Sequence, residues 1–558
     1  MILVIRVYNN FKSSTIGSMT KKRNASKKKK QTEKVKKLSF QEKFERYFGA
    51  KYTGLYVAGI FLIVMCVISY TFHKIGDYGV ETDFYQSYVP AAQALLHGNI
   101  MIDGFRGPGY QIVLGTFGFI FGDFFNAGIF IAILSAAVFI YFTFETLKRL
   151  FSLRVSALVV ILMIFNTIFI QYSYSAGTDM FFAALLSIVF YLLFKNETIN
   201  YKNLILASFI SGYAYLTRYN GVFILGFLVI ILFVNYWQID WKKRTKYSLT
   251  FLVVFFATIT PWGIYCLKEK GNFFYNENFR NVAYELYGKG KIGWDQFWYG
   301  SSDQFTSLSG VILKDPVLFL KHTAGNIYIH FIGDMNSLLG WYIGVFVILG
   351  IVFFIYNFRN ETLRSRKNSY LIMNIFFFII LLLVFYSERF SIFLIPFYLV
   401  FAVTGLIGEN KSLSKIFAKQ FVNFVVLVLV VISVVTMYGF NSSRIDSGPE
   451  EILLIKNWYF DNVPEKERGK TIAARKPQIS YYLDMTLHVI PLASNYEQFI
   501  SKLRKEKDDY LYFSLIEAQT RPRFQFLLNP ISNHPGLKTV VYIQNPPAVL
   551  YKVLDDTK

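Results

Sequence analysis

About eleven apolar runs divide the sequence, and this succession limits the possible folds more than any other feature. A helix rises about 1.5 Å per residue, so about 20 apolar residues cross the roughly 30 Å of hydrocarbon in a bilayer. With 54% of its 558 residues hydrophobic, the chain cannot bury this much apolar surface in one soluble core. We therefore expect an all-α polytopic membrane protein with about eleven transmembrane helices. The runs lie approximately at 52–70, 124–147, 155–176, 178–194, 203–217, 221–236, 247–267, 336–356, 369–386, 390–408 and 419–439.

Basic residues between these runs predict the orientation of the chain, because cytoplasmic connections are enriched in Lys and Arg. The block from Lys21 to Arg46 would make residues 1–50 a basic cytoplasmic tail, beside anionic lipid rather than nucleic acid. Residues 1–19 lack the features of a signal peptide. We expect a multi-pass protein of the plasma (inner) membrane with a cytoplasmic N-terminus. The other basic clusters are Lys148, Arg149 and Arg154; Lys195 and Lys202; Lys242, Lys243, Arg244 and Lys246; Arg359, Arg364, Arg366 and Lys367; and Lys411 and Lys415.

Two segments near the first run are predicted to lie along the membrane rather than across it. Apolar residues recur at helical spacing from Tyr85 to Leu96, which favours an amphipathic interfacial helix that ends at His97-Gly98-Asn99. The apolar run 107–122 is short and bracketed by glycines. If it crossed the membrane, the basic cluster at Lys148 would lie outside, so we expect an in-plane or re-entrant segment.

Two larger pieces are expected on the outer side. Residues 269–332 form a polar and aromatic stretch that is too long for a passive connection. Residues 441–558 have helix-like charged stretches at 450–460 and 496–508 and strand-like runs at 510–515 and 539–543. We expect the second piece to fold as a small extracytoplasmic α/β domain.

Three acidic residues are predicted to face the outer side. Asp83 follows the first run among aromatic residues, where a carboxylate can act as a general base toward a hydroxyl. Glu81 is two residues away and could share that role, and Asp179 lies at the outer turn between two later runs. Solvation at the interface, or capping of the helices that follow, would also explain Asp83 and Asp179.

Three arginines are expected at the same face. Arg218 and Arg389 lie at outer ends of apolar runs, against the positive-inside trend, and Arg106 precedes Gly107-Pro108-Gly109. A guanidinium matches a phosphate geometrically, and the position suits a phosphate carried on a lipid. Snorkelling, or pairing such as Arg389 with Glu388, would explain each arginine singly.

Acids that activate a hydroxyl and arginines that bind a lipid-linked phosphate together indicate group transfer at the outer face. Two other classes remain open: a transporter of lipid-linked glycans, and a polymerase or ligase of surface polysaccharide. A transporter favours charged residues near the middle of its spans and paired broken helices, whereas the charged groups here cluster at span ends.

The order and sidedness of these motifs resemble the polytopic GT-C glycosyltransferases, in the branch of protein O-mannosyltransferases and the aminoarabinose transferase of lipid A (glycosyltransferase family 39). The resemblance rests on the first-loop acid, Arg106 with its Gly-Pro-Gly step, the acid at the next outer turn, Leu-Thr-Arg-Tyr-Asn-Gly at 216–221, and Glu-Arg-Phe at 388–390. It implies that residues 51–440 form a catalytic transmembrane domain. The extracytoplasmic piece 441–558 is similar to domains appended to many bacterial members.

The resemblance implies an inverting transfer from a polyprenyl-phosphate sugar to a hydroxyl of a protein, lipid or glycan. Asp83 would be the base, Asp179 would orient the acceptor or the loop, and Arg106 would bind the donor phosphate with Arg218 or Arg389. The mannosyltransferases have an adjacent Asp-Glu pair, whereas this chain has Glu81-Thr82-Asp83, so the division between the two acids stays open. No nucleotide is implied, and a divalent metal is possible but not required.

Overall fold

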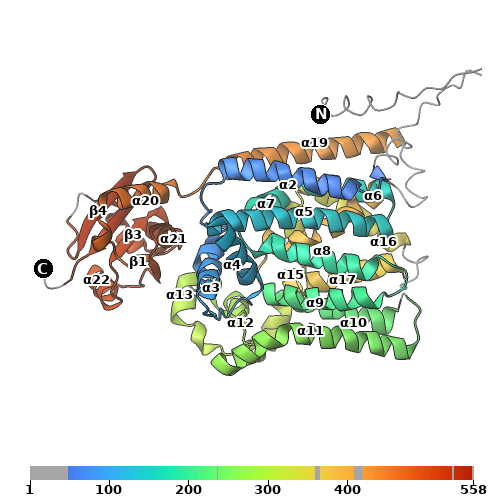
Figure 1. Ribbon diagram of the computed structural model, residues 1–558, viewed down its shortest axis with the longest axis horizontal. Helices are drawn as coiled ribbons and strands as arrows, with labels where there is room; N and C mark the ends of the chain where they lie inside the picture. Colours follow the sequence, from blue (N-terminus) through green and yellow to red (C-terminus); the bar gives the residue numbers. More distant parts are fainter. Residues whose placement is uncertain (1–47, 236, 358–364, 408–418, 531–532, 556–558) are drawn as a thin grey trace, which may run out of the picture.

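The computed structural model describes residues 48–235, 237–357, 365–407, 419–530 and 533–555. Long helices form a bundle, and a small domain with a β-sheet follows it at one end (Figure 1). We call the end of the bundle nearest this domain the domain end, and the opposite end the far end. The architecture confirms the predicted all-α polytopic fold with a small C-terminal α/β domain.

Each of the eleven predicted spans coincides with a helix or a broken helix. Within the described residues, five helices are long and apolar enough to cross a membrane by themselves, or six if one bent pair is counted as a span. The bundle consists of α2 (Thr53–Phe72), α5 (Phe124–Leu150), α6 (Leu153–Ile164), α7 (Thr167–Tyr174), α8 (Thr178–Phe194), α9 (Tyr201–Thr217), η3 (Tyr219–Gly226), α10 (Phe227–Val229), η4 (Ile230–Val234), α11 (Trp241–Lys270), α15 (Pro316–Gly333), η7 (Asp334–Leu338), α16 (Trp341–Asn357), α17 (Arg366–Leu381), η9 (Glu388–Leu394), α18 (Ile395–Ile407) and α19 (Lys419–Arg444).

The predicted continuous span 155–176 is wrong in one respect, because the chain bends by 62° between α6 and α7. Asn166 lies at the bend. Its side-chain oxygen caps α7 by accepting from the N–H of Phe169, and its amide donates 2.7 Å to the carbonyl of Leu338. The buried polar side chain thus satisfies one backbone N–H that the break exposes and ties the bend to the end of η7.

The positions of the helices in the bundle follow from which faces are apolar. α5 is buried over most of its length and packs against α2, α4 (Gly109–Phe121) and α8. α2 and α19 lie at the edge of the bundle (Figure 1) and expose apolar side chains such as Ile60 and Val435. Exposed apolar surface of this extent is what a lipid environment requires.

Short helices cluster at the domain end (Figure 1). The π-turn η2 (Phe84–Tyr88) and α3 (Val89–Leu96) form the predicted amphipathic segment, and Gly98 follows with a positive φ of 78°. The run 107–122 forms α4 (Gly109–Phe121), whose 13 residues are too few for a span.

The predicted long polar connection 269–332 is mostly helical. α11 continues to Lys270, and α15 begins at Pro316 and packs on the bundle, where the side-chain amide of Asn326 donates 2.8 Å to the carbonyl of Leu382. Between them lie α12 (Phe279–Ala283), η5 (Tyr284–Gly288), α13 (Trp294–Gly300), η6 (Ser302–Gln304) and α14 (Leu308–Lys314).

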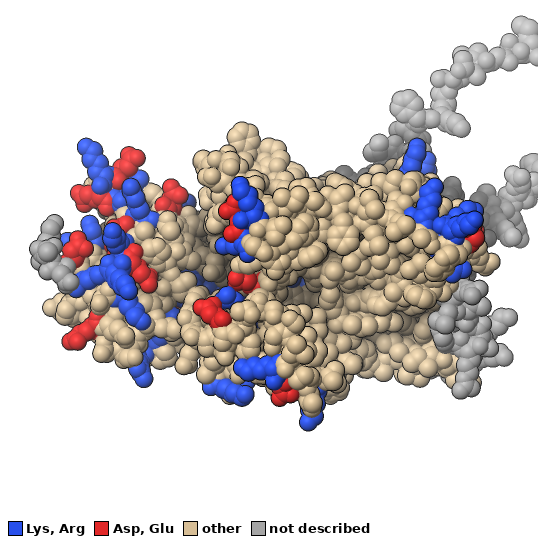
Figure 2. Space-filling view, turned by 90° about the horizontal axis from the view of Figure 1, so that it is seen from below, with Lys and Arg blue, Asp and Glu red and all other residues tan. Residues whose placement is uncertain are grey.

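On the face shown in Figure 2, basic side chains gather at the far end, whereas the middle of the bundle is almost free of charge. The predicted cytoplasmic connections make contacts there: Arg154 donates 2.6 Å to Asn423 near the start of α19, and Lys367 lies 5.2 Å from the ring centre of Phe151 in another connection. The N-terminal tail up to residue 47, Arg359, Arg364, Lys411 and Lys415 lie outside the described residues.

The C-terminal domain has five strands, β1 (Thr471–Ala474), β2 (Thr486–Val489), β3 (Tyr510–Ser514), β4 (Leu537–Gln544) and β5 (Pro547–Val553), and its two longest helices are α20 (Glu450–Asn462) and α22 (Tyr496–Lys505). The strands form a mixed sheet between helices, in the order β2-β1-β3-β5-β4. β1 pairs in parallel with β2 and β3, and β5 pairs antiparallel with β3 and β4. Side chains alternate along β3, so that Tyr510 and Tyr512 pack under α20 while Leu511 and Phe513 pack under α22. The other elements are η10 (Glu465–Glu467), α21 (Gln478–Leu483), α23 (Leu515–Thr520) and η11 (Pro522–Leu528).

The close approach of α4 to the end of α9 gives a stability prediction. A Cβ on Gly107 would clash with the backbone carbonyl of Leu216, so we expect Gly107→Ala to cost about 1–3 kcal/mol. Thermal unfolding of the purified protein in detergent measures this change. Gly59→Ala in α2 is the matched control, because nothing lies within 4 Å of a Cβ there. Equal unfolding midpoints for the Gly107 variant and the wild type would contradict the predicted clash.

Candidate active site

A cavity of 940 Å³ lies at the domain end of the bundle. Figure 2 shows charged side chains beside the recess between the bundle and the C-terminal domain. The cavity is lined by the loop after α2, the turn before α4, the start of α8, the residues after α9 and α17, the connection between α11 and α15, and the C-terminal domain. The charged lining residues are Asp83, Asp103, Arg106, Asp179, Arg218, Arg389, Arg475 and Lys476.

Asp83 lies at the junction of two arginines. One of its carboxylate oxygens is 2.9 Å from Nη2 of Arg106, and the other is 3.5 Å from Nη2 of Arg389. Its side chain keeps 35% of its exposure, and this exposed part faces the cavity. The backbone reaches this position because η2, a π-turn, begins at the next residue, and such turns often re-aim side chains at functional sites.

The arginines control the ionisation of Asp83. Burial alone would raise the pKa of the carboxyl group, but Arg106, Arg389 and the more distant Arg218 outweigh it and lower the pKa to about 2. Asp83 is therefore fully ionised at neutral pH. An arginine-paired carboxylate is available as a proton acceptor, although a weak one.

Arg106 is held on two sides before the first turn of α4. Its Nη1 donates 2.7 Å to Asp103 and 3.1 Å to the hydroxyl of Ser87, and its guanidinium lies 5.1 Å from the ring centre of Tyr88. A bridge between the backbones of Asp103 and Arg106 sets the turn that brings both side chains to the cavity. Arg106 thus links two carboxylates, and its orientation is fixed.

Asp179 and Arg218 form the second charged pair of the cavity. Asp179 is in the first turn of α8, and its carboxylate accepts from Nη1 of Arg218 at the end of α9. Arg218 also donates 3.3 Å to Thr178 and lies 5.3 Å from the ring centre of Phe390. The N-cap position of α8 is occupied by Gly177, so Asp179 is not the capping residue. The structure thus gives it a partner across helices instead of the cap that its sequence position suggested.

Glu81 points away from the cavity and is not among the lining residues. Its carboxylate is 3.2 Å from Nε2 of His73 and accepts from the backbone N–H groups of Asp77, at 2.8 Å, and Ala176, at 2.5 Å. It ties the loop after α2 to the turn before α8. The structure therefore brings five of the six predicted site residues together and separates the sixth.

Sequence reasoning missed the part of the cavity that the C-terminal domain supplies. Lys476 donates 2.8 Å to the carbonyl of Tyr78 and 2.9 Å to the hydroxyl of Thr82, next to Asp83. Arg475 makes two bonds, of 3.0 and 2.7 Å, to Asp295 of α13. The sequence contains only the basic pair Arg475-Lys476 as a signal, and the folded chain alone shows that the pair reaches the loop after α2.

The three carboxylates that line the cavity each contact an arginine, so a divalent cation there would have to displace a guanidinium. Elsewhere in the described part of the chain, one close group of metal-ligating types occurs: His488, Glu506 and Asp508 in the C-terminal domain. None of these three lines the cavity.

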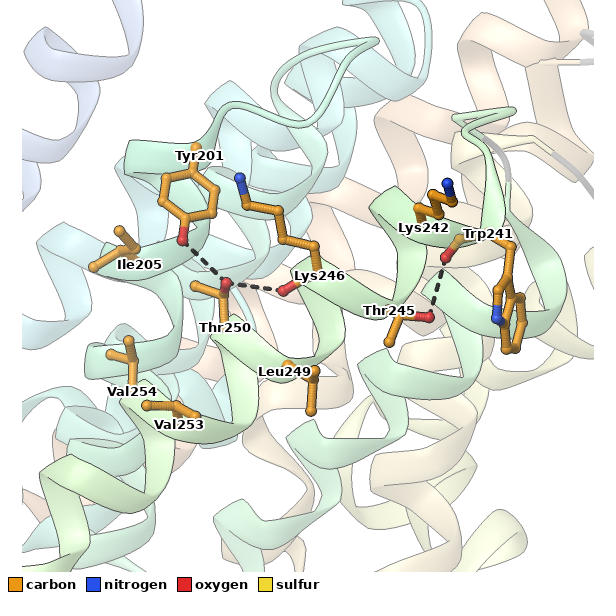
Figure 3. A pocket seen from close by; sticks show the side chains of 10 residues that line it. All are labelled: Tyr201, Ile205, Trp241, Lys242, Thr245, Lys246, Leu249, Thr250, Val253 and Val254. Atoms are coloured by element: carbon orange, nitrogen blue, oxygen red, sulfur yellow. Dashed lines mark hydrogen bonds between the residues drawn. The ribbon is translucent and has the colours of Figure 1, made fainter.

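A second hollow lies between α9 and α11 on the side of the bundle (Figure 3). Its lining is mainly apolar, with two lysines, Lys242 and Lys246, and contains no carboxylate. A hydrogen bond of 3.1 Å between Tyr201 and Thr250 joins the two helices. The hollow lacks the paired acids and arginines of the first cavity, so we assign the candidate active site to the domain end.

Comparison with known proteins gives one family match. Residues 106–265 match the family model described as dolichyl-phosphate-mannose-protein mannosyltransferase. This match covers Arg106, Asp179 and Arg218. No curated protein sequence matches the chain.

Two solved structures share the fold over most of their length. ArnT from Cupriavidus metallidurans, bound to undecaprenyl phosphate, is 13% identical with a TM-score of 0.54, over 90% of this chain and 98% of ArnT. The oligosaccharyltransferase AglB from Archaeoglobus fulgidus, in complex with an inhibitory peptide and a dolichol phosphate, is 13% identical with a TM-score of 0.54, over 91% of this chain and 75% of AglB. The chain therefore has the GT-C fold that the sequence resemblance predicted.

Proposed function

We propose that the protein is a membrane glycosyltransferase that moves a sugar from a polyprenyl-phosphate donor to a hydroxyl of a protein, lipid or glycan, with inversion at the sugar carbon. The observation that carries the proposal is one carboxylate, Asp83, held between two arginines on a cavity at the end of an apolar bundle. The family match and the fold of two proteins that bind polyprenyl phosphates support it.

The geometry supports a division of labour in the cavity. Arg106, Arg218 and Arg389 are the donor-phosphate ligands, because their guanidinium groups line the cavity at the boundary with the bundle. Asp83 is the general base, and Asp179 holds Arg218. Glu81 positions the loop that carries Asp83, through His73 and the backbone of Ala176.

Donor binding would also activate the base. A phosphate that enters beside Asp83 competes for Arg389 and Arg106, and its negative charge repels the carboxylate. Both effects raise the pKa of Asp83 from its low value in the free protein. The carboxylate then accepts the acceptor's hydroxyl proton while the oxygen attacks the sugar carbon and the phosphate leaves on its lipid.

This coupling predicts a difference between two pH profiles. The pH dependence of kcat/KM reports the free protein, and that of kcat reports the complex with donor. Since the base works only when ionised, each rate falls as the pH drops through the pKa of Asp83, which is about 2 in the free protein. We expect kcat/KM to show no acid loss from this group above pH ~4, and kcat to fall at a higher pH. If kcat and kcat/KM fall at the same pH, the donor phosphate does not take Arg389 and Arg106 away from Asp83.

We propose that the protein lies in the plasma (inner) membrane. The domain end of the bundle and the C-terminal domain would face the side away from the cytoplasm. The basic side chains at the far end support this, because positive loops stay inside. Cysteine labelling of intact cells, with one cysteine in α20 and one in the connection after α5, tests it. If a reagent added outside the cells labels only the cysteine in the connection after α5, the orientation is the reverse of the one proposed.

The proposed activity is tested with purified protein and a panel of polyprenyl-phosphate sugars. Transfer releases polyprenyl phosphate in equal amount to the glycosylated acceptor, and the product has the inverted anomeric configuration. A retained configuration would exclude a single displacement with Asp83 as base. Movement of intact donor across a vesicle membrane would indicate transport instead.

A further inference from the structure

We infer that Lys476 of the C-terminal domain is an anion-binding residue of the cavity, so that the domain supplies part of the substrate site. The inference rests on the proposed function for the identity of the cavity, but it stands on different residues. Lys476 follows β1, which lies between β2 and β3 in the parallel part of the sheet. Ligands of α/β sheets commonly bind beyond the carboxyl ends of such strands.

The surroundings of Lys476 differ from those of every other lining cation. Arg106 and Arg389 contact Asp83, Arg218 contacts Asp179, and Arg475 contacts Asp295. Among the described residues, Lys476 has no carboxylate partner within salt-bridge distance. Its two acceptors are neutral: the carbonyl of Tyr78 and the hydroxyl of Thr82, which itself donates to that carbonyl.

An ammonium group has three protons, so these two bonds leave one for a ligand. The half-buried position makes a charge without a directly bound counter-ion costly: burial and Arg475 lower the pKa of Lys476, and the more distant Asp83, Asp77 and Glu517 offset this only in part. An anion in the cavity would supply a counter-charge in direct contact with the ammonium group. A phosphate or a carboxylate has the required chemistry, and lysine binds such groups as a point charge.

Two sources could supply the anion: the donor's lipid-linked phosphate or an anionic group on the acceptor. Lys476 comes from the domain, whereas Arg218 and Arg389 come from ends of bundle helices. The lipid-linked phosphate therefore has its own ligands near the bundle, and an acceptor that enters past the domain would meet Lys476. Binding experiments separate the two sources.

The test uses the full-length protein in detergent, with undecaprenyl phosphate and inorganic phosphate as probes. Trp294 and Trp298 line the cavity, so their fluorescence reports binding. The variants are Lys476→Gln, Lys476→Met as a second neutral form, and Lys476→Arg as the charge-preserving form. Gln478→Met is the matched control, because Gln478 also bonds the loop, at 3.1 Å to the carbonyl of Asp77, but does not line the cavity.

We expect a neutral residue at 476 to weaken binding of one probe about tenfold or more, with Lys476→Arg close to the wild type. Weaker undecaprenyl phosphate binding identifies the donor phosphate. Weaker binding of inorganic phosphate to protein saturated with undecaprenyl phosphate identifies an acceptor anion. Unchanged affinity for both probes, or equal losses in the Gln478 control, would overturn the inference.

This outcome is separate from that of the proposed function. Wild-type protein that binds no undecaprenyl phosphate would contradict the proposed donor, while titration of the lipid-free protein with inorganic phosphate would still test Lys476. Thermal unfolding of each variant accompanies the titrations. A lower unfolding midpoint with unchanged affinities would mean that Lys476 only joins the domain to the loop, which also overturns the inference.

Discussion

Asp83→Asn is expected to lower the rate of sugar transfer by about 10²- to 10⁴-fold, the range in which a positioned general base contributes. Asparagine keeps the size of the side chain and can still accept from Arg106, which lies 2.9 Å away. It cannot take a proton from the acceptor. Affinity for the donor is expected to persist or to increase, because Arg106 and Arg389 lose a competing carboxylate. Single-turnover transfer and donor titration measure the two effects.

Asp103→Asn is the matched control for this variant. Asp103 contacts the same guanidinium, at 2.7 Å, and also lines the cavity. If the carboxylates only hold Arg106, both variants should lose activity to the same degree. If Asp83 is the base, the Asp103 variant loses about tenfold or less, the worth of one hydrogen bond. Comparable losses would remove Asp83 from the catalytic role.

Arg389→Ala is expected to have the second largest effect, on donor affinity. Of the three predicted phosphate ligands, Arg389 has the longest ion pair, 3.5 Å to Asp83, so it can turn toward a phosphate at little cost. A hydrogen bond to a charged group contributes about 1.5–3 kcal/mol, which corresponds to a 10- to 150-fold rise in the donor KM. The acceptor KM should change little. Arg106→Ala should also weaken donor use more than acceptor use.

Arg444→Ala provides the control for loss of an arginine at this end of the bundle. Arg444 ends α19 and contacts the ring of Phe440, and it does not line the cavity. Donor KM should be unchanged in this variant. A rise in acceptor KM with Arg389→Ala, and no change in donor KM, would move Arg389 from the donor site to the acceptor site.

The sequence predicted much of the fold because apolar runs and basic connections carry strong, local signals. The bend between α6 and α7 was missed because Asn166 interrupts an otherwise apolar run, and its partner Leu338 is distant in sequence. In the C-terminal domain, α20, α22, β3 and β4 were predicted from patterned stretches. The four-residue strands β1 and β2 are too short to show alternation.

The predicted topology placed five of the site residues on one side of the membrane: Asp83, Arg106, Asp179, Arg218 and Arg389. In the structure these side chains lie around one cavity. Their roles remain predictions. Asp83 and Glu81 were both predicted on the outer side, so the prediction could not tell which of them faces the cavity. That difference depends on the local geometry of the loop. The bond of Glu81 to His73 decides which acid faces the cavity. Lys476 was missed for a different reason, since it reaches the site through docking of a separate domain.

The most direct test of the proposed glycosyltransferase activity is transfer of radiolabelled sugar from polyprenyl-phosphate donors by purified wild-type protein and by Asp83→Asn. We expect labelled acceptor and released polyprenyl phosphate in equal amounts with the wild type, and donor binding without transfer in the variant. Donor binding by the wild type with no bond cleavage, across the whole donor panel and every acceptor class, would contradict the assignment and favour transport of a lipid-linked glycan.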